Sequence, residues 1–150
     1  MITFIGSRIF VLIVLATLHQ GGLPSDALGN WTVGKPYDVG QPIGLDAKQE
    51  DKINGLNIGL APNHIEVCGK NVPIKSIDVD QLTRDDFLRK YNFPPDSIGL
   101  KGSSIVEVSI NVLHSTRACG DFEDPGSHLF IADRHVVIEV GNDYFPLKRR

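Results

Sequence analysis

The chain has 150 residues, of which 41% are hydrophobic and 22% charged, and its formal net charge is −3. This composition is ordinary for a globular domain and does not indicate intrinsic disorder. It lacks the features of a nucleic-acid-binding protein, because the only basic run, 148–150, is short and no basic stripe is interleaved with aromatic residues.

The N-terminus has the pattern of a secretory signal peptide. Arg8 precedes an unbroken apolar run over 9–18. This run is about ten residues long, whereas a helix needs roughly 20 to cross a bilayer. We therefore expect the protein to be exported, either to the periplasm or out of the cell, and to have no membrane contact once the leader is cleaved. An uncleaved membrane anchor is the alternative.

The cleavage site is expected before Asn30, because small residues precede it at Ala27 and Gly29. This gives a signal peptide over 1–29 and a single exported domain over 30–150. Cleavage nearer Gly22 is the alternative. About 120 residues would remain, which is enough for one modest core.

The two cysteines, Cys68 and Cys119, predict one disulfide, because an even number of cysteines in an exported chain favours pairing. Closing a loop of about 52 residues would stabilise the fold by roughly 4 kcal/mol on the chain-entropy model. A redox pair or a metal site is the competing interpretation. The chain has no Cys-x-x-Cys motif.

The first half of the chain predicts one short helix and three strands. Segment 30–37 should be irregular, because glycines and prolines crowd its end. Asp46 is placed to cap the helix and Gly55 to end it. The expected elements are a helix at 46–54 and strands at 56–60, 64–68 and, more weakly, 74–79.

A second helix is predicted over 83–91. Thr83 is a suitable cap, and acidic residues in the first turn with basic residues in the last suit the helix dipole. Phe87, Leu88 and Tyr91 have the spacing of one apolar face. A strand with clean alternation of side chains follows at 105–113.

The segment 127–140 predicts a β-hairpin that turns at Asp133-Arg134 and pairs with strand 105–113. This register sets Phe130 opposite Val137 and His128 opposite Glu139. One face of the hairpin is then wholly apolar and must be covered. That face consists of Leu129, Ile131, Val136, Ile138 and Val140.

A last edge strand is expected at 144–148, where Pro146 would be tolerated at the edge. The fold class is therefore α+β: mainly an antiparallel β-sheet or partly open barrel, with about five to seven strands and two short helices.

The chain resembles small exported bacterial proteins of uncharacterised function, whose mature part ends in a phenylalanine followed by a leucine and basic residues, here over 145–149. Gly29-Asn30-Trp31 is also similar to the Gly-x-Trp pattern on the first strand of lipocalin-like proteins, the calycins. The resemblance implies an antiparallel β fold and, by analogy with small periplasmic β proteins, an inhibitor or immunity role. It implies no site residues.

The expected binding surface combines the loop 114–126 with the outer face of the hairpin. Loops held by a scaffold often carry binding residues, and mixed aromatic and titratable groups are typical of protein contacts. A partner that is itself a cationic protein would suit the acidic loop, and an inhibitor of a secreted hydrolase is the sharpest form of this hypothesis. The candidate residues are Asp121, Glu123, Asp124, His128, Phe130 and His135.

Three alternatives remain. The apolar hairpin face could hold a small apolar ligand, which would make the protein a carrier. A metal-assisted hydrolase could use ligands from the set His114, Asp121, His128 and His135. Ser115 beside His114 resembles a nucleophile and base, but no elbow motif surrounds it. We therefore predict no catalytic residue, no metal site and no cofactor.

Overall fold

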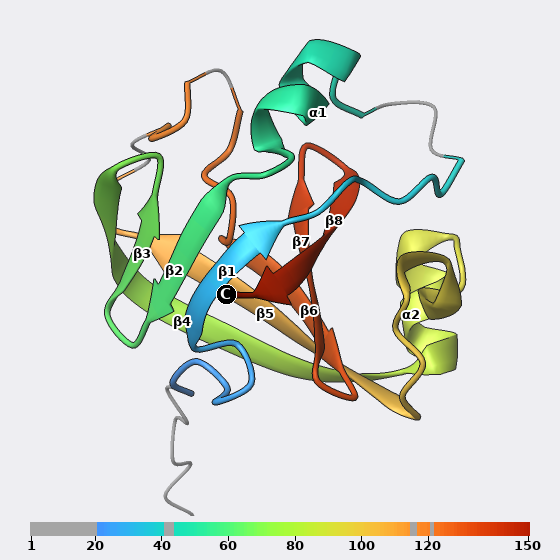
Figure 1. The fold of residues 1–150 in the computed structure, drawn as a ribbon. Helices are drawn as coiled ribbons and strands as arrows, with labels where there is room; N and C mark the ends of the chain where they lie inside the picture. Colours follow the sequence, from blue (N-terminus) through green and yellow to red (C-terminus); the bar gives the residue numbers. More distant parts are fainter. Residues whose placement is uncertain (1–20, 41–43, 115–116, 121) are drawn as a thin grey trace, which may run out of the picture.

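In the computed structural model, residues 21–40, 44–114, 117–120 and 122–150 are described. They form eight antiparallel strands that close into a barrel in sequence order, with β1 paired to both β2 and β8 (Figure 1). The strands are β1 (Gly29–Val33), β2 (Asn57–Ala61), β3 (His64–Val67), β4 (Lys70–Thr83), β5 (Ser104–Val112), β6 (His128–Ala132), β7 (His135–Val140) and β8 (Asp143–Arg149).

Two α-helices and one 3-10 helix lie outside the barrel: α1 (Ala47–Ile53), α2 (Arg84–Tyr91) and η1 (Pro95–Ile98). Both α-helices begin where the sequence predicts. Asp46 caps α1 and Thr83 caps α2, each in a reciprocal capping box with the residue three positions on. The predicted mainly antiparallel β fold with two short helices is confirmed, but the barrel is closed rather than partly open.

Closure depends on two segments for which the sequence predicts other structure. Segment 30–37 is predicted to be irregular, yet its first four residues belong to β1, and the predicted edge strand is a barrel strand, β8. Pro146 fits because its carbonyl accepts a hydrogen bond from the Gly34 N–H at 2.8 Å, just past the last β1–β8 pair. The backbone nitrogen of Pro146, which carries no hydrogen, faces the same side as its carbonyl. This side lies beyond the last β1–β8 pair, so no ladder hydrogen bond needs a donor there.

The barrel interior is filled by the chain's own apolar side chains. The predicted apolar face of the hairpin points inward, and Leu129 and Ile138 are fully buried there against side chains from the other strands. The predicted register is also confirmed, because Phe130 pairs with Val137 and β5 pairs with β6. The interior is therefore a packed core.

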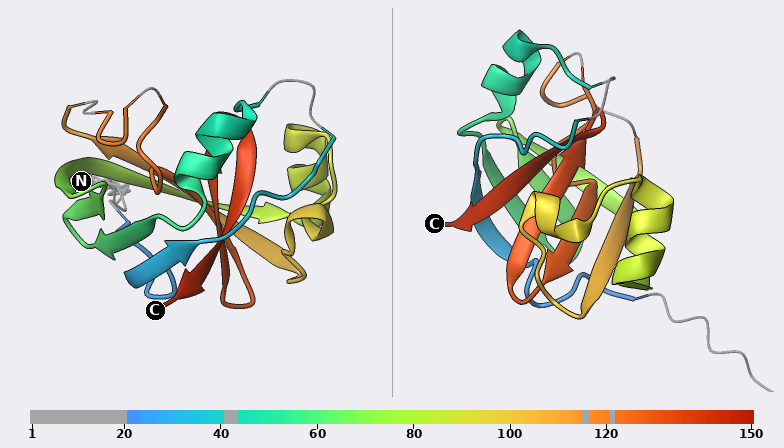
Figure 2. Two further views of the ribbon diagram at one scale, coloured as in Figure 1. Left: turned by 45° about the horizontal axis from the view of Figure 1, so that its top comes forward. Right: turned by 90° about the vertical axis from the view of Figure 1, so that its right-hand side faces the viewer.

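A second core lies outside the barrel, beneath α2 (Figure 2). Phe130 and Val137, on the outer face of the hairpin, are 0% and 1% exposed. The Phe130 ring lies 5.5 Å from that of Phe87 and 5.1 Å from that of Tyr91. The expected exposed outer face is thus wrong at these two positions, because the apolar face of α2 needs cover and takes it from the hairpin.

The segment before β1 belongs to the folded domain. Ala27 is fully buried, and its carbonyl accepts a hydrogen bond from the Trp31 indole N–H at 2.8 Å. Arg149 lies over the Trp31 ring and donates to the carbonyls of Asp26 and Leu28. Cleavage before Asn30 would remove Asp26, Ala27 and Leu28, whose carbonyls accept these hydrogen bonds, whereas cleavage nearer Gly22 would leave them in place.

The predicted disulfide between Cys68 and Cys119 is present. It joins the turn after β3 to the loop between β5 and β6. That loop packs on the barrel core, since Phe122 is buried and Gly126 lies against Ile58. No helix formed by the described residues is long and apolar enough to span a membrane.

Candidate functional site

One end of the barrel gathers irregular segments that lie far apart in the sequence. The segment after β1, α1, the turn between β7 and β8, and the loop between β5 and β6 all lie at this end (Figures 1 and 2). We call it the α1 end. Loops on a rigid scaffold are the usual place for binding residues, so this end is the first place to look for a site.

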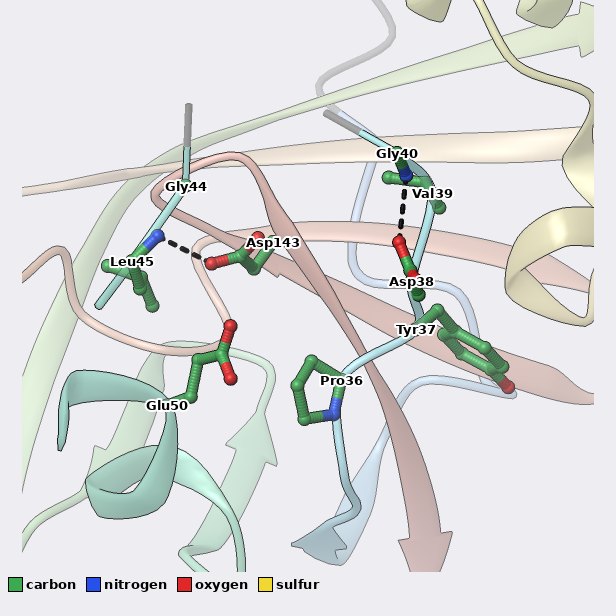
Figure 3. A pocket seen from close by; sticks show the side chains of 9 residues that line it. All are labelled: Pro36, Tyr37, Asp38, Val39, Gly40, Gly44, Leu45, Glu50 and Asp143. Carbon is green, nitrogen blue, oxygen red and sulfur yellow. Dashed lines mark hydrogen bonds between the residues drawn. The ribbon is translucent and has the colours of Figure 1, made fainter. Parts of the chain in front are cut away.

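A cavity of about 510 Å³ opens at the α1 end, between segment 36–40 and α1. Its volume is within the range typical of ligand sites. Three carboxylates line it, and none of the described lining residues is basic (Figure 3). The lining includes Pro36, Tyr37, Asp38, Leu45, Glu50 and Asp143.

Each carboxylate comes from a different element. Asp38 accepts a hydrogen bond from the Gly40 N–H at 3.0 Å, within the segment after β1. Asp143 begins β8 and accepts from the Leu45 N–H at 2.6 Å, which holds the chain before α1 against the barrel. Glu50 lies in the first turn of α1. Asp143 thus ties the wall before α1 to the barrel, and the hydrogen bond from the Tyr37 N–H to the Tyr144 carbonyl ties the other wall to β8.

The cavity has a negative electrostatic environment. Partial desolvation, then the negative charges of Asp143, Asp51 and Asp46, raise the pKa of Glu50 above its ordinary value. Like charges, with no basic residue among the described lining, favour the binding of a cationic group, which would relieve their repulsion. Within the described part of the chain, no group of three histidine, cysteine or acidic residues is close enough to hold a metal ion.

The acidic residues predicted in the loop 114–126 have different environments. Glu123 is exposed, whereas Asp124 is buried and accepts a hydrogen bond from the Ala118 N–H. Both line a second cavity, of about 370 Å³, beside the end of β5. Asp121 lies outside the described residues. Glu123 and Asp124 therefore border the same cavity, and Asp124 also holds the loop through its hydrogen bond from Ala118.

The residues predicted on the hairpin do not form one surface. Phe130 is in the core beneath α2, and His135 is exposed beside the β6–β7 turn, away from the α1 end (Figure 1). His128 belongs to a polar network at the other end of the hairpin from His135. The histidines proposed as metal ligands are thus not brought together, since His114 is exposed at the end of β5.

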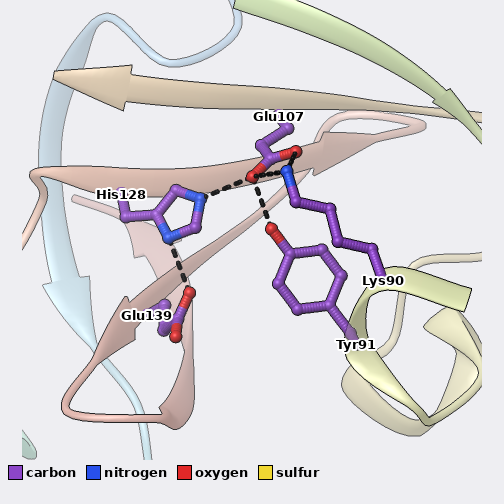
Figure 4. Close-up of polar contacts among 5 residues, drawn as sticks. All are labelled: Lys90, Tyr91, Glu107, His128 and Glu139. Carbon is purple, nitrogen blue, oxygen red and sulfur yellow. Dashed lines mark hydrogen bonds and ion pairs between the residues drawn. The ribbon is translucent and has the colours of Figure 1, made fainter. Parts of the chain in front are cut away.

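The network around His128 joins α2 to the barrel (Figure 4). His128 Nδ1 lies 2.6 Å from Glu139 Oε2, and Nε2 lies 3.0 Å from Glu107 Oε1. Glu107 also accepts hydrogen bonds from Lys90 Nζ, at 2.7 and 2.9 Å, and from the Tyr91 hydroxyl. The predicted cross-strand pair of His128 with Glu139 is therefore present, within a larger set.

The network favours a charged imidazole. Both ring nitrogens face carboxylates, and only imidazolium donates from both. Burial alone would lower the pKa of His128, but hydrogen bonds and charges from Glu139 and Glu107 outweigh it and raise that pKa. Burial likewise opposes ionisation of Glu107, yet its hydrogen bonds to Lys90, Tyr91 and His128 lower its pKa. His128 thus serves as a clamp and has no free nitrogen for a metal.

This clamp predicts a dependence of stability on pH. The raised pKa of His128 means that its contribution is full below about pH 6.5, its ordinary pKa, and is lost as pH rises through the folded pKa. The lowered pKa of Glu107 means that its contribution is present above about 4.5 and is lost as pH falls through the folded value. The network should stabilise most between these two values.

Urea unfolding from pH 4 to pH 9 measures this effect. At pH 6, His128→Gln should cost about 2 kcal/mol, the scale of charge-assisted hydrogen bonds, and the cost should shrink at alkaline pH. The exposed His135 is the matched control, and His135→Gln should follow the wild-type profile. A His128→Gln profile parallel to wild type throughout would contradict the clamp.

No local pattern in the sequence marks the cavity at the α1 end. Leu45 and Asp143 are 98 positions apart, and only the closure of the barrel brings Asp38, Glu50 and Asp143 to one place. The sequence does predict a binding surface at the same end of the barrel, because the loop with Glu123 and Asp124 lies there. No protein-family model, curated protein or solved structure matches this chain.

Proposed function

We propose that this protein is an exported, non-enzymatic binding protein that captures a cationic protein partner at the α1 end. The observation that carries the proposal is the cavity of about 510 Å³ with three carboxylates and no basic residue among its described lining. A lysine or arginine side chain of the partner would enter this cavity. An inhibitor or immunity role toward a secreted enzyme is the sharpest form of this function.

The size and the chemistry of the cavity support this ligand class. A bare metal ion would leave most of the volume empty, whereas a long basic side chain has both the length and the charge to fill it. Glu50 and Asp38 could pair with a guanidinium or an ammonium, as charged groups on protein surfaces commonly do. The repulsion that raises the pKa of Glu50 would fall on binding.

Export is part of the proposal. The disulfide between Cys68 and Cys119 suits an oxidising compartment, and the N-terminal pattern suits a secretory leader. With segment 23–28 packed on the barrel, the proposed cleavage moves to the neighbourhood of Gly22.

The proposed contact surface differs from the one expected from the sequence. Glu123 stays in it, because its loop lies at the α1 end, but Phe130 does not, because it is buried. The carrier alternative has no comparable support, since Leu129, Ile131 and Ile138 pack within the barrel core.

A side-chain probe tests the cavity directly. The amide signals of isotope-labelled protein would be followed by NMR during titration with acetyl-arginine amide, and separately with its neutral analogue acetyl-citrulline amide. We expect the arginine probe to shift the signals of residues 36–40, Glu50 and Asp143, and the citrulline probe to leave them in place.

Matched variants locate the charge that matters. Glu50→Gln should weaken arginine binding about two- to fivefold, the effect of one exposed charge pair. Asp85→Asn removes the same charge from the exposed first turn of α2, outside the cavity, and should leave binding unchanged. Equal shifts by both probes, or equal effects of both variants, would refute the role of the cavity.

A further inference from the structure

Strand β4 has a free edge along much of its length. It pairs with β3 only over Lys70–Pro73, and with β5 over Ile74–Thr83. From Ser76 to Thr83, no strand among the described residues pairs with β4 on the β3 side. Figure 1 shows β4 running on past the end of β3 along the side of the barrel opposite α1. Within the described part of the chain, no strand takes up its outward N–H and C=O groups there, as at the edge of an open sheet.

The two faces of this edge differ in chemistry. Asp78 and Asp80 are exposed and lie opposite Ser109 and Glu107 of β5, which places them on the outer face of the barrel. Val79 points to the inner face, yet it is 41% exposed. The edge therefore alternates an acidic outer side with an uncovered apolar inner side.

A cavity adjoins the apolar side. It has a volume of about 440 Å³ and is lined by Gly21, Gly22 and residues 77–80. Gly21 is near Val79, so the described chain begins at this edge without pairing to it. A strand added to β4 would place alternate side chains over Val79 and into this cavity.

We propose that the free edge of β4 takes up an extended segment of a cationic partner protein as an added strand, with basic side chains alternating with apolar ones. Residues that pair across antiparallel strands point to the same face. Basic residues of the segment would thus meet Asp78 and Asp80, while the apolar residues between them would cover Val79. This surface shares no residue with the cavity at the α1 end, so the inference stands or fails independently of the proposed function.

A second copy of the chain suits the acidic centre of this edge, residues 78–80, poorly. Two β4 strands related by a two-fold axis would pair residues symmetrically about the axis. If the axis passed through Asp78 or Asp80, that residue would lie opposite its own copy. If the axis passed through Val79, Asp78 of one strand would lie opposite Asp80 of the other. Like charges directly opposed across strands are destabilising. A basic partner replaces this repulsion with attraction.

The test uses the full oxidised chain and a synthetic seven-residue peptide of alternating lysine and valine, capped at both ends. Amide hydrogen exchange followed by NMR would report on residues 75–82. We expect the peptide to protect alternate amides of this stretch. A capped peptide of the same composition, with its lysines and valines in separate blocks, should bind about tenfold more weakly, because it cannot match both faces at once.

Variants separate charge from strand pairing. Asp78→Asn combined with Asp80→Asn should weaken the alternating peptide severalfold, and Asp85→Asn combined with Glu66→Gln, at exposed positions away from this edge, should not. An alternating peptide with N-methylated backbone keeps its charge and should lose the protection. Equal binding of the block or methylated peptide, or no protection of residues 75–82, would overturn the proposal.

Amide exchange of the protein without added peptide tests whether a second copy, or the chain's own N-terminus, occupies the β4 edge instead. Protection of residues 75–82 that grows with protein concentration would show that a second copy occupies the edge. Protection that is already complete and independent of concentration would show that the chain's own first 20 residues occupy it. Either result would overturn the assignment to a cationic partner.

Discussion

Replacing Phe130 with alanine is expected to lower the free energy of unfolding by about 3–5 kcal/mol, the usual cost of truncating a buried aromatic side chain. Phe130 is fully buried, and its ring contacts those of Phe87 and Tyr91 on α2 and of His128 on its own strand. The truncation would leave a cavity between α2 and the barrel. Urea unfolding at pH 6 measures the change.

Leu88 provides the control for this experiment, because it lies on α2 beside Phe87 and is 45% exposed. Leu88→Ala should change the free energy of unfolding by less than about 1 kcal/mol. If Phe130 were instead a surface contact residue, both substitutions would have similarly small effects, and the position of α2 on the hairpin would be wrong.

Loss of the disulfide should have an effect of similar size. Cys68 and Cys119 are separated by 51 positions, and closing a loop of this length lowers the entropy of the unfolded chain by an amount worth roughly 4 kcal/mol. The double variant Cys68→Ser with Cys119→Ser should therefore shift the urea midpoint strongly downward. The loop that carries Cys119 and the buried Phe122 should loosen first.

Wild-type protein in a reducing buffer should match the double variant, since both lack the same cross-link. The double variant itself should not respond to the reductant. A midpoint within experimental error of the oxidised wild type would mean that the disulfide adds nothing to the packing of this loop.

The local elements could be predicted because their signals are local. Asp46 and Thr83 each start a helix through a cap within one turn, and the turn at Asp133-Arg134 sets the hairpin register. Closure of the barrel could not be predicted in this way. The pairing of Trp31 with Arg149 joins the two ends of the domain, and no short pattern marks such a pair.

The candidate site likewise has a part that local sequence patterns predict and a part that depends on closure of the barrel. The acidic loop is visible in the sequence because Glu123 and Asp124 are neighbours. The cavity is not visible, because Asp38, Glu50 and Asp143 meet only after the barrel closes. Phe130 was misplaced for a related reason: alternation fixes which face of the hairpin it lies on, but not whether a helix from elsewhere in the chain covers that face.

The measurement that tests the central claim most directly is capture from the native periplasmic or extracellular fraction. The bait is the oxidised chain, compared with Asp38→Asn combined with Glu50→Gln, and with Asp85→Asn combined with Glu66→Gln, at exposed positions outside both proposed surfaces, as the charge-matched control. We predict that the wild type and the control retain one cationic protein in stoichiometric amount, and that the cavity variant and high salt release it. Equal capture by the cavity variant, or a co-purifying lipid or metabolite with no protein, would contradict the account.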